Sequence, residues 1–452
     1  MSVIASDQFK IVVGLGTTGY SCAQYLAERG EHFAVVDTRE MPPMLEALNT
    51  HYPEVQVHLG PLDAKVLSRA SEIVLSPGIA KDTPAIAAAV AAGADLVGDI
   101  DLFCRAVEAP VVAITGSNAK TTVTTLLGEM ASKGGIDVGV GGNIGTPVLE
   151  FLQQPPKAMY ILELSSFQLE LTSQLNASVA AVLNITPDHL DRYDNDFQQY
   201  YTAKHRIFKG CRSVAENLDD PLSQPLINTD VSKVGYRMGV SDFNIFGLLI
   251  RDGEEYLALA REPLMKVSEL KMLGRHNVQN ALSALAIGYL AGIDMAAMLD
   301  VLSRFSGIEH RCEWVCDYDG VDYFNDSKGT NVGATVAAIE GLGSRDGQKQ
   351  LLLIAGGDGK GADFSALRAP IAQYVTHLIL IGTDASRIAQ IADEVDVHFA
   401  SSMEEAVALS ATLAKEGDKV LLSPACASFD MFSNYEARGH AFKSAVGGLS
   451  AA

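Results

Sequence analysis

Apolar runs of strand length alternate with helical stretches along almost the whole of the 452-residue chain. This alternation is typical of βαβ units, in which parallel strands are joined by helices. The runs KIVVGLG and HFAVVD occur near the start of the chain, and LLLIAGG, HLILIG and VLLSPA occur near its end. The sequence therefore predicts an α/β fold with mostly parallel sheets and a doubly wound pattern at both ends.

The length indicates about three domains, with two as the alternative, since one domain has roughly 100–200 residues. Changes in pattern predict a Rossmann-like domain at residues 1–98, a central domain at 99–306 and a second Rossmann-like domain at 307–452. The central domain is expected to hold a mostly parallel sheet behind a phosphate-binding loop. It also contains a predicted two-strand hairpin with Asp252-Gly253 at the turn.

The charge balance excludes some functions. Lys and Arg number 34 and Asp and Glu number 55, so the formal net charge is −21. Such a chain is not expected to bind nucleic acid or an anionic membrane. The N-terminus has no leader pattern, and the longest nearly apolar run, 281–293, is shorter than the about 20 residues that span a bilayer. We therefore expect a cytoplasmic protein whose six scattered cysteines are reduced thiols.

The first glycine loop, Gly14–Gly19, follows a strand and opens a helix. Asp37 ends the next strand, where an acidic residue of a Rossmann fold would meet a ribose hydroxyl. NAD binding is the obvious interpretation, and a tight turn without a ligand is the alternative. Nothing downstream supplies hydride chemistry, so the loop alone does not decide the function.

A second glycine loop, Gly116–Thr122, also joins a strand to a helix. In a P-loop, backbone N–H groups surround the phosphates, a lysine reaches the β- and γ-phosphates, and the next hydroxyl binds Mg²⁺. Lys120 and Thr121 fit these two roles, although Ile114 and Ala119 depart from the general pattern of such loops. The alternative, a solvated lysine at a helix start, is electrostatically unfavourable.

The run Ala113–Thr122 resembles the phosphate loop of the Mur ligases, a family of ATP-dependent enzymes that form amide bonds. Other runs of this family extend along the whole chain, namely Asp37-Thr38-Arg39, Ser76-Pro77-Gly78, Gly141–Gly145, Glu163–Gln168, Asp188–Arg192, Ala203-Lys204, His276-Asn277, His310-Arg311, Asn325–Lys328, Gly356–Lys360 and Ser423–Ser428.

Two residues depart from the family. Ala119 replaces the usual glycine, so we expect this loop position not to need a positive φ. Gly329 replaces the usual alanine, and neither change removes a functional group.

The resemblance is greatest to members that attach D-glutamate. It implies ATP, Mg²⁺, UDP-N-acetylmuramoyl-L-alanine and D-glutamate as cofactor and substrates, in peptidoglycan precursor synthesis. The carboxylate would be activated as an acyl phosphate, which the amine then attacks.

The resemblance also implies a role for each matching residue. The implied catalytic residues are Lys120, His189 and Lys204, and the implied metal ligands are Thr121, Glu163, His189 and Lys204, the last if it is carboxylated. ATP would be bound by Gly116, Ser117, Asn118, Ala119, Lys120, Thr121, Thr122, Asn277, Asn280, Arg311 and Asp326. The UDP-substrate would be bound by Gly16, Thr17, Thr18, Thr38, Arg39, Ser76, Gly78, Asn143 and His189. D-Glutamate would be bound by Lys328, Thr330, Lys360, Ser428, Phe429 and Tyr435.

From the residues alone, several of these have plainer interpretations. Glu163 could equally be a capped loop carboxylate, and His189 an ordinary satisfied polar group. Lys204 has the pattern of an exposed helical lysine, while Asn277 and Ser428 could be helix caps.

Two rival functions remain at this point. A folylpolyglutamate synthetase would share the triphosphate loop but lacks a Rossmann-like first segment. An NAD-binding sensor would leave Lys120, Glu163 and Lys204 unexplained. The leading interpretation is the amide ligase, and we expect it to act as a monomer.

Overall fold

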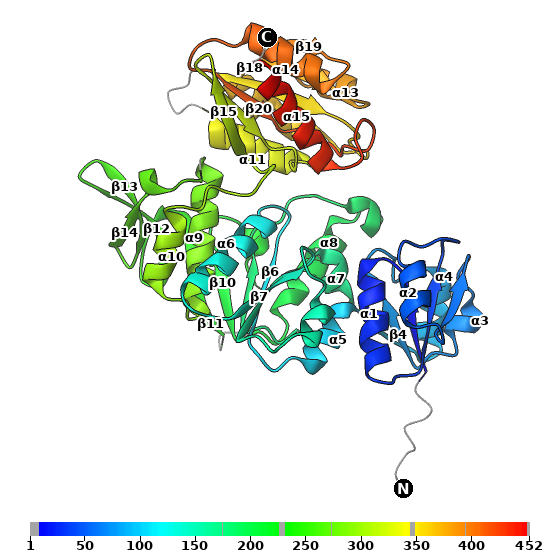
Figure 1. Cartoon of the computed structure of the whole chain (residues 1–452). Helices are drawn as coiled ribbons and strands as arrows, with labels where there is room; N and C mark the ends of the chain where they lie inside the picture. The colour runs from blue at the N-terminus through cyan, green and yellow to red at the C-terminus, as the bar shows by residue number, and fades with distance from the viewer. Residues whose placement is uncertain are drawn as a thin grey trace. The chain divides into compact units, whose positions relative to one another are not determined.

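The computed structural model describes residues 9–173, 175–225, 231–272, 274–343, 349–393 and 395–449. In these residues the chain forms three β-sheets combined with α-helices (Figure 1). The strands within each sheet pair mostly in parallel, for example β1 with β2, β6 with β8 and β16 with β20. The predicted α/β fold class is confirmed.

The first sheet has the strand order β3-β2-β1-β4-β5, and its strands pair in parallel. The order reverses between β1 and β4, which gives a Rossmann-type switch point at the carboxyl end of β1. The strands are β1 (Lys10–Val13), β2 (Phe33–Asp37), β3 (Gln56–Leu59), β4 (Glu72–Leu75) and β5 (Asp95–Val97). The helices are α1 (Thr17–Glu28), α2 (Leu45–His51), α3 (Ala64–Leu67), α4 (Pro84–Ala91) and α5 (Asp99–Ala106).

The second sheet has the order β14-β13-β12-β11-β10-β9-β6-β8-β7. Strands β12 and β13 are joined at Asp252 and Gly253, which both have positive φ, as a tight hairpin turn requires. The strands are β6 (Val111–Thr115), β7 (Val138–Gly142), β8 (Met159–Glu163), β9 (Val179–Val182), β10 (Ser213–Asn217), β11 (Ser232–Val240), β12 (Ile245–Arg251), β13 (Glu254–Leu259) and β14 (Glu262–Lys266). The helices are α6 (Lys120–Lys133), α7 (Ser166–Leu171), α8 (Phe197–His205), α9 (Arg275–Leu290) and α10 (Met295–Leu302), with 3₁₀ turns η1 (Val148–Gln153), η2 (Leu190–Tyr193), η3 (Arg206–Phe208), η4 (Pro221–Ser223) and η5 (Val267–Glu269).

The third sheet has the order β15-β16-β20-β17-β18-β19, with an antiparallel pair at one edge formed by β15 and β16. The strands are β15 (Glu313–Tyr318), β16 (Val321–Asn325), β17 (Leu351–Gly356), β18 (Val375–Ile381), β19 (Asp396–Phe399) and β20 (Lys419–Leu422). The helices are α11 (Val332–Leu342), α12 (Arg368–Tyr374), α13 (Ala385–Ala389), α14 (Met403–Leu413) and α15 (Tyr435–Leu449), and η6 is Ser365–Leu367.

Both faces of this third sheet are covered, which explains the unbroken apolar run of β17. Leu351 and Leu353 belong to a core cluster with residues of α11, α12 and α13. Leu352 and Ile354 belong to a second cluster with residues of α14 and α15. Alternate side chains of a strand point to opposite faces, so a strand buried on both sides is apolar throughout. This is the doubly wound arrangement that the sequence predicts.

By its internal contacts the chain divides into two compact units. One comprises Met1–Gly247, Leu259–Arg261 and Ser283–Leu299, and the other comprises Leu248–Ala258, Glu262–Leu282 and Asp300–Ala452. Within the first unit, one hydrophobic cluster contains residues of β1, α1, α5, β6 and β8. The first and second sheets therefore share a core. The three-domain boundaries at 98/99 and 306/307 fall between sheets and remain a prediction.

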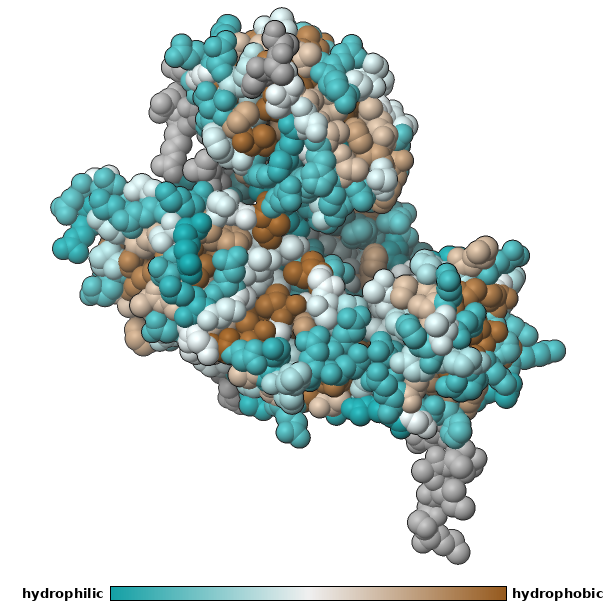
Figure 2. Space-filling view, viewed as in Figure 1, coloured by the Kyte–Doolittle hydropathy of each residue, from teal (hydrophilic) through white to brown (hydrophobic). Residues whose placement is uncertain are grey.

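Hydrophilic residues cover much of the visible surface, with smaller hydrophobic areas between them (Figure 2). No helix of the described residues is long and apolar enough to cross a membrane. All six cysteines are free thiols.

Candidate functional site

The first glycine loop lies between β1 and α1 at the switch point of the first sheet. A Cβ atom added to Gly19 would lie 1.7 Å from the carbonyl oxygen of Gly14, whereas one added to Gly16 would meet nothing within 4 Å. Gly19 therefore permits close packing, and Gly16 leaves open space at the start of α1. Gly16 is also the N-cap of α1, and as a glycine it has no side chain that could cap the helix. This helix N-terminus can accept an anion.

The other predicted UDP-substrate residues of this sheet follow neighbouring strands. Thr17 and Thr18 follow β1, Thr38 and Arg39 follow β2, and Ser76 and Gly78 follow β4. Because β2, β1 and β4 are adjacent and parallel, the structure brings all of them to one edge of the sheet. The Ser76 hydroxyl donates to the Gly14 carbonyl oxygen over 3.1 Å and so joins two of these loops.

Asp37 holds this edge together. Its buried carboxylate accepts the Leu15 N–H at 2.6 Å and the Arg39 Nε–H at 2.9 Å, and the Arg39 Nη2 atom lies 2.7 Å from the second oxygen. Burial raises the pKa of Asp37, but the hydrogen bonds from Arg39 and Leu15 outweigh it and lower the pKa to about 2. Both oxygens are thus engaged by the chain itself, which leaves Asp37 a structural role and no ribose-reading one.

The second glycine loop connects β6 to α6. Ala119 is the N-cap of α6 and has φ 66° and ψ −6°, in the left-handed region. The expectation that this position does not need a positive φ is therefore wrong. Alanine is small enough to adopt this conformation at a modest energetic cost, which glycine would avoid. The Lys120 ammonium donates to the carbonyl oxygens of Gly116 at 2.8 Å and Ser117 at 2.9 Å.

Residues that the sequence interpretation missed fix this loop from behind. The Ser117 hydroxyl lies 2.7 Å from the Tyr200 hydroxyl and accepts the Thr186 N–H at 2.9 Å. Asn184 lies just after β9. Its side-chain amide accepts the Asn118 N–H and donates to the Asn118 carbonyl oxygen. The available signal was that Asn184 follows a buried strand, at the edge where ligands of parallel sheets bind.

Glu163 ends β8, beside the loop strand β6, and is 1% exposed. Its Oε1 accepts from the Asn143 side-chain amide at 2.9 Å, and its backbone oxygen accepts the Asn143 N–H at 2.8 Å. Its Oε2 is buried and has no hydrogen-bond partner among the described residues. A buried carboxylate oxygen without a donor suits a hard cation such as Mg²⁺, so this position fits the predicted metal site.

Lys204 is not the exposed helical lysine that its pattern indicates. Its side chain in α8 is buried, and its Nζ donates to the Gly116 carbonyl oxygen at 2.8 Å. Burial, together with the positive charge of Lys120, lowers the pKa of Lys204 well below its usual value, although Asp188 and Glu163 oppose the shift. A helical pattern gives the position of a residue along the helix, but not which residues from distant parts of the chain cover it.

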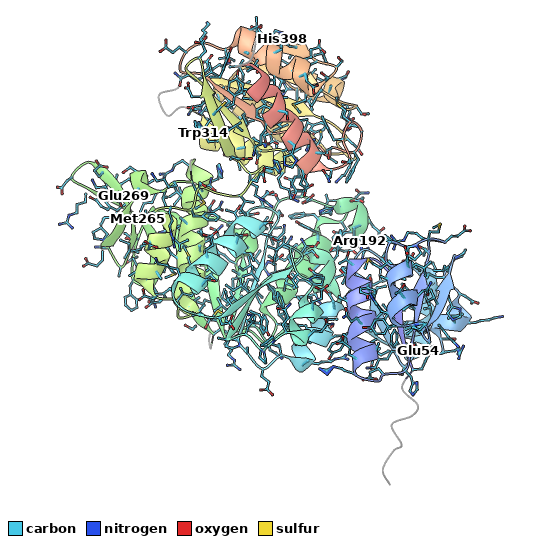
Figure 3. The ribbon with its side chains drawn as sticks, in the orientation of Figure 1. Glu54, Arg192, Met265, Glu269, Trp314 and His398 are labelled. Carbon is cyan, nitrogen blue, oxygen red and sulfur yellow. The ribbon has the colours of Figure 1, made fainter. Side chains whose placement is uncertain are left out.

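His189 lies after β9 with φ 52°, and about half of its side chain is exposed. Its Nε2 is 3.7 Å from an Asp188 oxygen, and its ring meets the edge of Phe167. Arg192, a few residues on (Figure 3), donates to the Ile79 carbonyl oxygen at 2.8 Å and pairs with Glu170. The segment after β9 is thereby fixed to the loop after β4.

Asn277 and Asn280 lie side by side in the first two turns of α9. Both are buried, and the Asn280 amide donates to Asn277 Oδ1 over 2.9 Å. Asn277 is the third residue of the helix, so the capping alternative does not apply. The pair presents one amide group per side chain in a fixed orientation.

In the third segment, Asp326 follows β16 and is buried. It accepts the Ser423 hydroxyl at 2.7 Å and the Cys312 N–H at 3.2 Å. Burial raises the pKa of Asp326 to about 6, against the lowering effects of Ser423 and Arg311. A Cβ atom added to Gly329 would lie 2.5 Å from Asp326 Oδ2. The absence of a side chain at Gly329 therefore leaves space for the Asp326 carboxyl group.

The predicted amino-acid-binding residues come from three loops of the third segment and from the first residue of α15, Tyr435. The Lys328 ammonium lies 3.7 Å from the centre of the Tyr435 ring, and the Thr330 N–H donates to the Lys328 carbonyl oxygen. An isolated bridge between Asp358 and Ala427 connects the loop of Lys360 with that of Ser428. Ser428 is buried and precedes α15 by several residues, so it is not its cap, while Phe429 is exposed.

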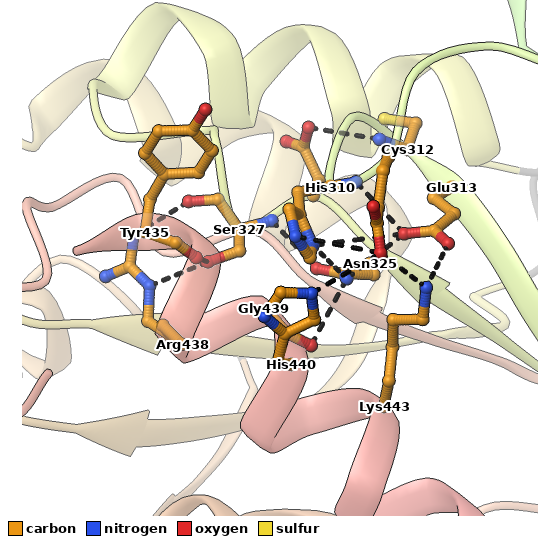
Figure 4. Close-up of polar contacts among 12 residues, drawn as sticks. His310, Cys312, Glu313, Asn325, Ser327, Tyr435, Arg438, Gly439, His440 and Lys443 are labelled. Atoms are coloured by element: carbon orange, nitrogen blue, oxygen red, sulfur yellow. Dashed lines mark hydrogen bonds and ion pairs between the residues drawn. The ribbon is translucent and has the colours of Figure 1, made fainter. Parts of the chain in front are cut away.

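Arg438, also missed from the sequence, ties these loops together (Figure 4). Its buried guanidinium donates to the carbonyl oxygens of Ser327 and Cys426 and to the Ser327 hydroxyl, at 2.8–3.2 Å. Burial lowers its pKa to about 10. Arg438 shares a buried helix face with Phe442 and Val446, and a charged residue on an apolar face was the signal in the sequence.

One group in the described residues, Glu309, His310 and His440, has the composition of a metal site. The Lys443 ammonium already lies 2.9 Å from the Glu309 carboxylate. Asn325 Oδ1 accepts the Ser327 N–H, which turns its Nδ2 toward His310 Nδ1 at 2.9 Å. His310 Nδ1 is then an acceptor, so Nε2 carries the proton and cannot bind a metal.

A mostly parallel α/β chain with a Rossmann-type switch point, a glycine loop that leads into a helix opening with lysine, and a buried carboxylate beside that loop has the features of a nucleotide-dependent ligase. Family models match along the chain: the Mur ligase MurD-like N-terminal domain at residues 8–98, the Mur ligase middle domain at 114–288 and the Mur ligase glutamate ligase domain at 310–426.

Relatives agree with these matches. The chain is 56% identical over its full length to the UDP-N-acetylmuramoylalanine–D-glutamate ligase of Pseudomonas syringae pv. tomato, with 100% of each chain covered. It is 53% identical to the enzyme of that name from Pseudomonas aeruginosa, with 99% of each covered. The chain belongs to the Mur ligase family.

Solved structures show the same fold. A pseudomurein peptide ligase type C from Methanothermus fervidus matches with a TM-score of 0.60 and 18% identity, covering 98% of this chain and 100% of that one. A FolC structure from E. coli has a TM-score of 0.56 and 16% identity, and covers 78% of this chain and 93% of that one.

Proposed function

We propose that this chain joins D-glutamate to UDP-N-acetylmuramoyl-L-alanine with ATP, in cytoplasmic peptidoglycan precursor synthesis. The full-length identity to enzymes of that name is the observation that carries the proposal. The carboxylate of the UDP-substrate attacks the γ-phosphorus of ATP and ADP leaves. The amine of D-glutamate then attacks the acyl phosphate, and inorganic phosphate leaves.

The phosphate loop supplies the electrostatic part of this reaction. Lys120 lies over the loop with its ammonium group bonded to two backbone oxygens, and ATP phosphates offer it stronger acceptors. The first N–H groups of α6 have no acceptor within the helix and favour an anion. Negative charge that develops on the transferred phosphoryl group is thereby stabilised.

Thr121, Glu163, His189 and a carboxylated Lys204 are the proposed ligands of Mg²⁺. The unpartnered Oε2 of Glu163 supports this assignment. When bound, Mg²⁺ neutralises phosphoryl charge. Asn143 orients Glu163 through its second oxygen, so the carboxylate has one oxygen left for a cation.

The lowered pKa of Lys204 supports its carboxylation. The neutral amine attacks CO₂, a new N–C bond forms and one proton is released, which leaves a carbamate anion. The change converts a buried cation beside Lys120 into an anion that can pair with it. A carbamate ¹³C NMR signal after exposure to ¹³CO₂, absent in Lys204→Arg, is the expected result.

The remaining residues recognise the two substrates. The edge of the first sheet, with Gly16, Thr17, Thr18, Thr38, Arg39, Ser76 and Gly78, holds the UDP group, together with Asn143 and His189. Asn277, Asn280, Arg311 and Asp326 hold the nucleoside of ATP. D-Glutamate has two carboxylates, which suit the cations of Lys328 and Lys360 and the donors of Thr330, Ser428, Phe429 and Tyr435.

The test is phosphate release from ATP with UDP-N-acetylmuramoyl-L-alanine and one of four amino acids. D-Glutamate should stimulate release, and L-glutamate, L-lysine and meso-diaminopimelate should not. Stimulation by a different amino acid would overturn the proposed substrate. Lys120→Ala is the control: it should lose on the order of 10²–10³ in rate and retain binding of the UDP-substrate. Size-exclusion chromatography with light scattering tests the expected monomer.

A further inference from the structure

Asn184, at the end of the neighbouring strand β9, binds the backbone of the phosphate loop at Asn118. The Asn118 N–H donates to Asn184 Oδ1 at 2.8 Å, and Asn184 Nδ2 donates to the Asn118 carbonyl oxygen at 3.2 Å. The Ser117 N–H donates to the backbone oxygen of Asn184 at 2.9 Å. Asn184 therefore makes three hydrogen bonds to two successive loop residues, two of them through its amide group.

These bonds bear on the conformation of the next residue, Ala119. The carbonyl oxygen of Asn118 and the N–H of Ala119 belong to one planar peptide unit. Fixing that oxygen fixes the plane from which φ of Ala119 is measured. Ala119 has φ 66°, which an alanine rarely adopts, and its methyl group offers no hydrogen bond that could stabilise this conformation. Its backbone oxygen accepts the Val123 N–H at 3.0 Å and so begins α6.

We propose that Asn184 is a positioning residue for ATP, because it holds Ala119 in the left-handed conformation in which α6 and Lys120 are ready for the phosphates. The inference rests on the proposed function, since it assumes that this loop binds the ATP phosphates. Because residue 119 is an alanine, the hydrogen bonds from Asn184 are necessary. Without them, Ala119 would favour negative φ. A glycine would populate the left-handed region without help.

A double-mutant cycle separates positioning from general stability. The variants are Asn184→Ala, Ala119→Gly and the double variant, each measured for binding of the β,γ-imido analogue of ATP with Mg²⁺ by calorimetry. Asn184→Ala should weaken binding about tenfold, which corresponds to about 1.4 kcal/mol. In the Ala119→Gly background the same change should weaken it by about threefold or less, because the binding conformation stays populated.

Asn217 provides a matched control. Its side-chain amide is also buried and donates to a backbone oxygen at the same strand end, that of Leu183, at 2.7 Å. Within the described residues, its side chain makes no hydrogen bond to the loop 116–119. Asn217→Ala should lower the melting temperature to a similar extent as Asn184→Ala but leave analogue binding within about twofold of wild type.

Equal loss of binding on Asn184→Ala in the wild-type and Ala119→Gly backgrounds would overturn the inference, and so would loss of binding in Asn217→Ala. Should Asn184→Ala fail to fold, Asn184→Ser, which lacks the amide, passes through the same cycle with the same two outcomes. Wild-type protein that does not bind the analogue would instead contradict the proposed ATP site. KM for the UDP-substrate should not change in any variant, because none of the variants alters a residue assigned to that substrate.

Discussion

The side chains of Lys204 and Lys120 both donate to the carbonyl oxygen of Gly116, each at 2.8 Å. Two ammonium groups that share one acceptor repel each other, and the buried one loses its proton more readily. Burial and this repulsion both lower the pKa of Lys204, so both favour its neutral amine over the charged form.

Lys204→Arg should therefore be inactive, with turnover reduced by at least about 10²-fold. Arginine stays charged when buried and cannot form a carbamate, so it places a permanent second cation beside Lys120. Steady-state phosphate release measures the effect. Lys209→Arg, at an exposed position just after α8, is the control and should keep wild-type turnover. Retained activity in Lys204→Arg would contradict both carboxylation and the proposed metal role.

Glu163→Gln tests the metal position separately. Glutamine can still accept from Asn143 through its oxygen, so the fold around β8 should persist. It removes the negative charge that the unpartnered Oε2 offers to a cation. Turnover should fall on the order of 10²-fold, and the Mg²⁺ concentration at half-maximal rate should rise. A variant with an unchanged Mg²⁺ dependence would show that the cation is held elsewhere.

The sequence was sufficient to predict the most buried strands of each sheet, because burial leaves a continuous apolar pattern. The continuous run of β17 and the glycine loops after β1 and β6 are local signals, and the structure has them where the sequence indicates. The antiparallel pair β15 and β16 was not predicted, since nothing in one strand identifies its partner across a turn.

The misses concern contacts between distant residues. Arg438 meets Ser327, which is 111 positions away in the chain, and Asn184 meets Asn118, which is 66 positions away. No local pattern encodes such pairs. Ala119 was misjudged for a different reason: its conformation is imposed by the surrounding loop, and composition alone suggests the opposite sign of φ.

Asp99 gives a prediction on pH-dependent stability. Burial raises the pKa of this carboxyl group to about 6, against the lowering effect of the Gln168 hydrogen bond. Its pKa in the unfolded chain is near 3.9. The folded state thus binds the proton more tightly, and the stabilisation is present below about pH 4 and lost as the pH rises through about 6.

The Asp99→Asn variant has no carboxyl group to ionise at this position, so it does not lose this stabilisation as the pH rises. Relative to wild type, the variant should gain about 2 kcal/mol of unfolding free energy between pH 4.5 and pH 8. Urea unfolding at both pH values measures it. Asp326, whose pKa is also raised, is present in both proteins. Its contribution to the pH dependence of stability therefore cancels when the variant is compared with wild type. A difference that does not change with pH would show that Asp99 is ionised in the folded protein at both values.

Gly329→Ala should disturb the group that Asp326 forms with Ser423. The added Cβ atom would lie 2.5 Å from Asp326 Oδ2 and 2.8 Å from Ser423 Oγ, both closer than packed atoms tolerate. The carboxyl group must then move and weaken the 2.7 Å bond from Ser423. We expect a loss of about 1–3 kcal/mol in unfolding free energy and a several-fold rise in KM for ATP. KM for the UDP-substrate should stay unchanged. Adding Ser423→Ala removes one of the two close contacts, so the double variant should recover part of the stability. Wild-type stability and KM for ATP in Gly329→Ala alone would mean that the loop after β16 shifts without effect on Asp326.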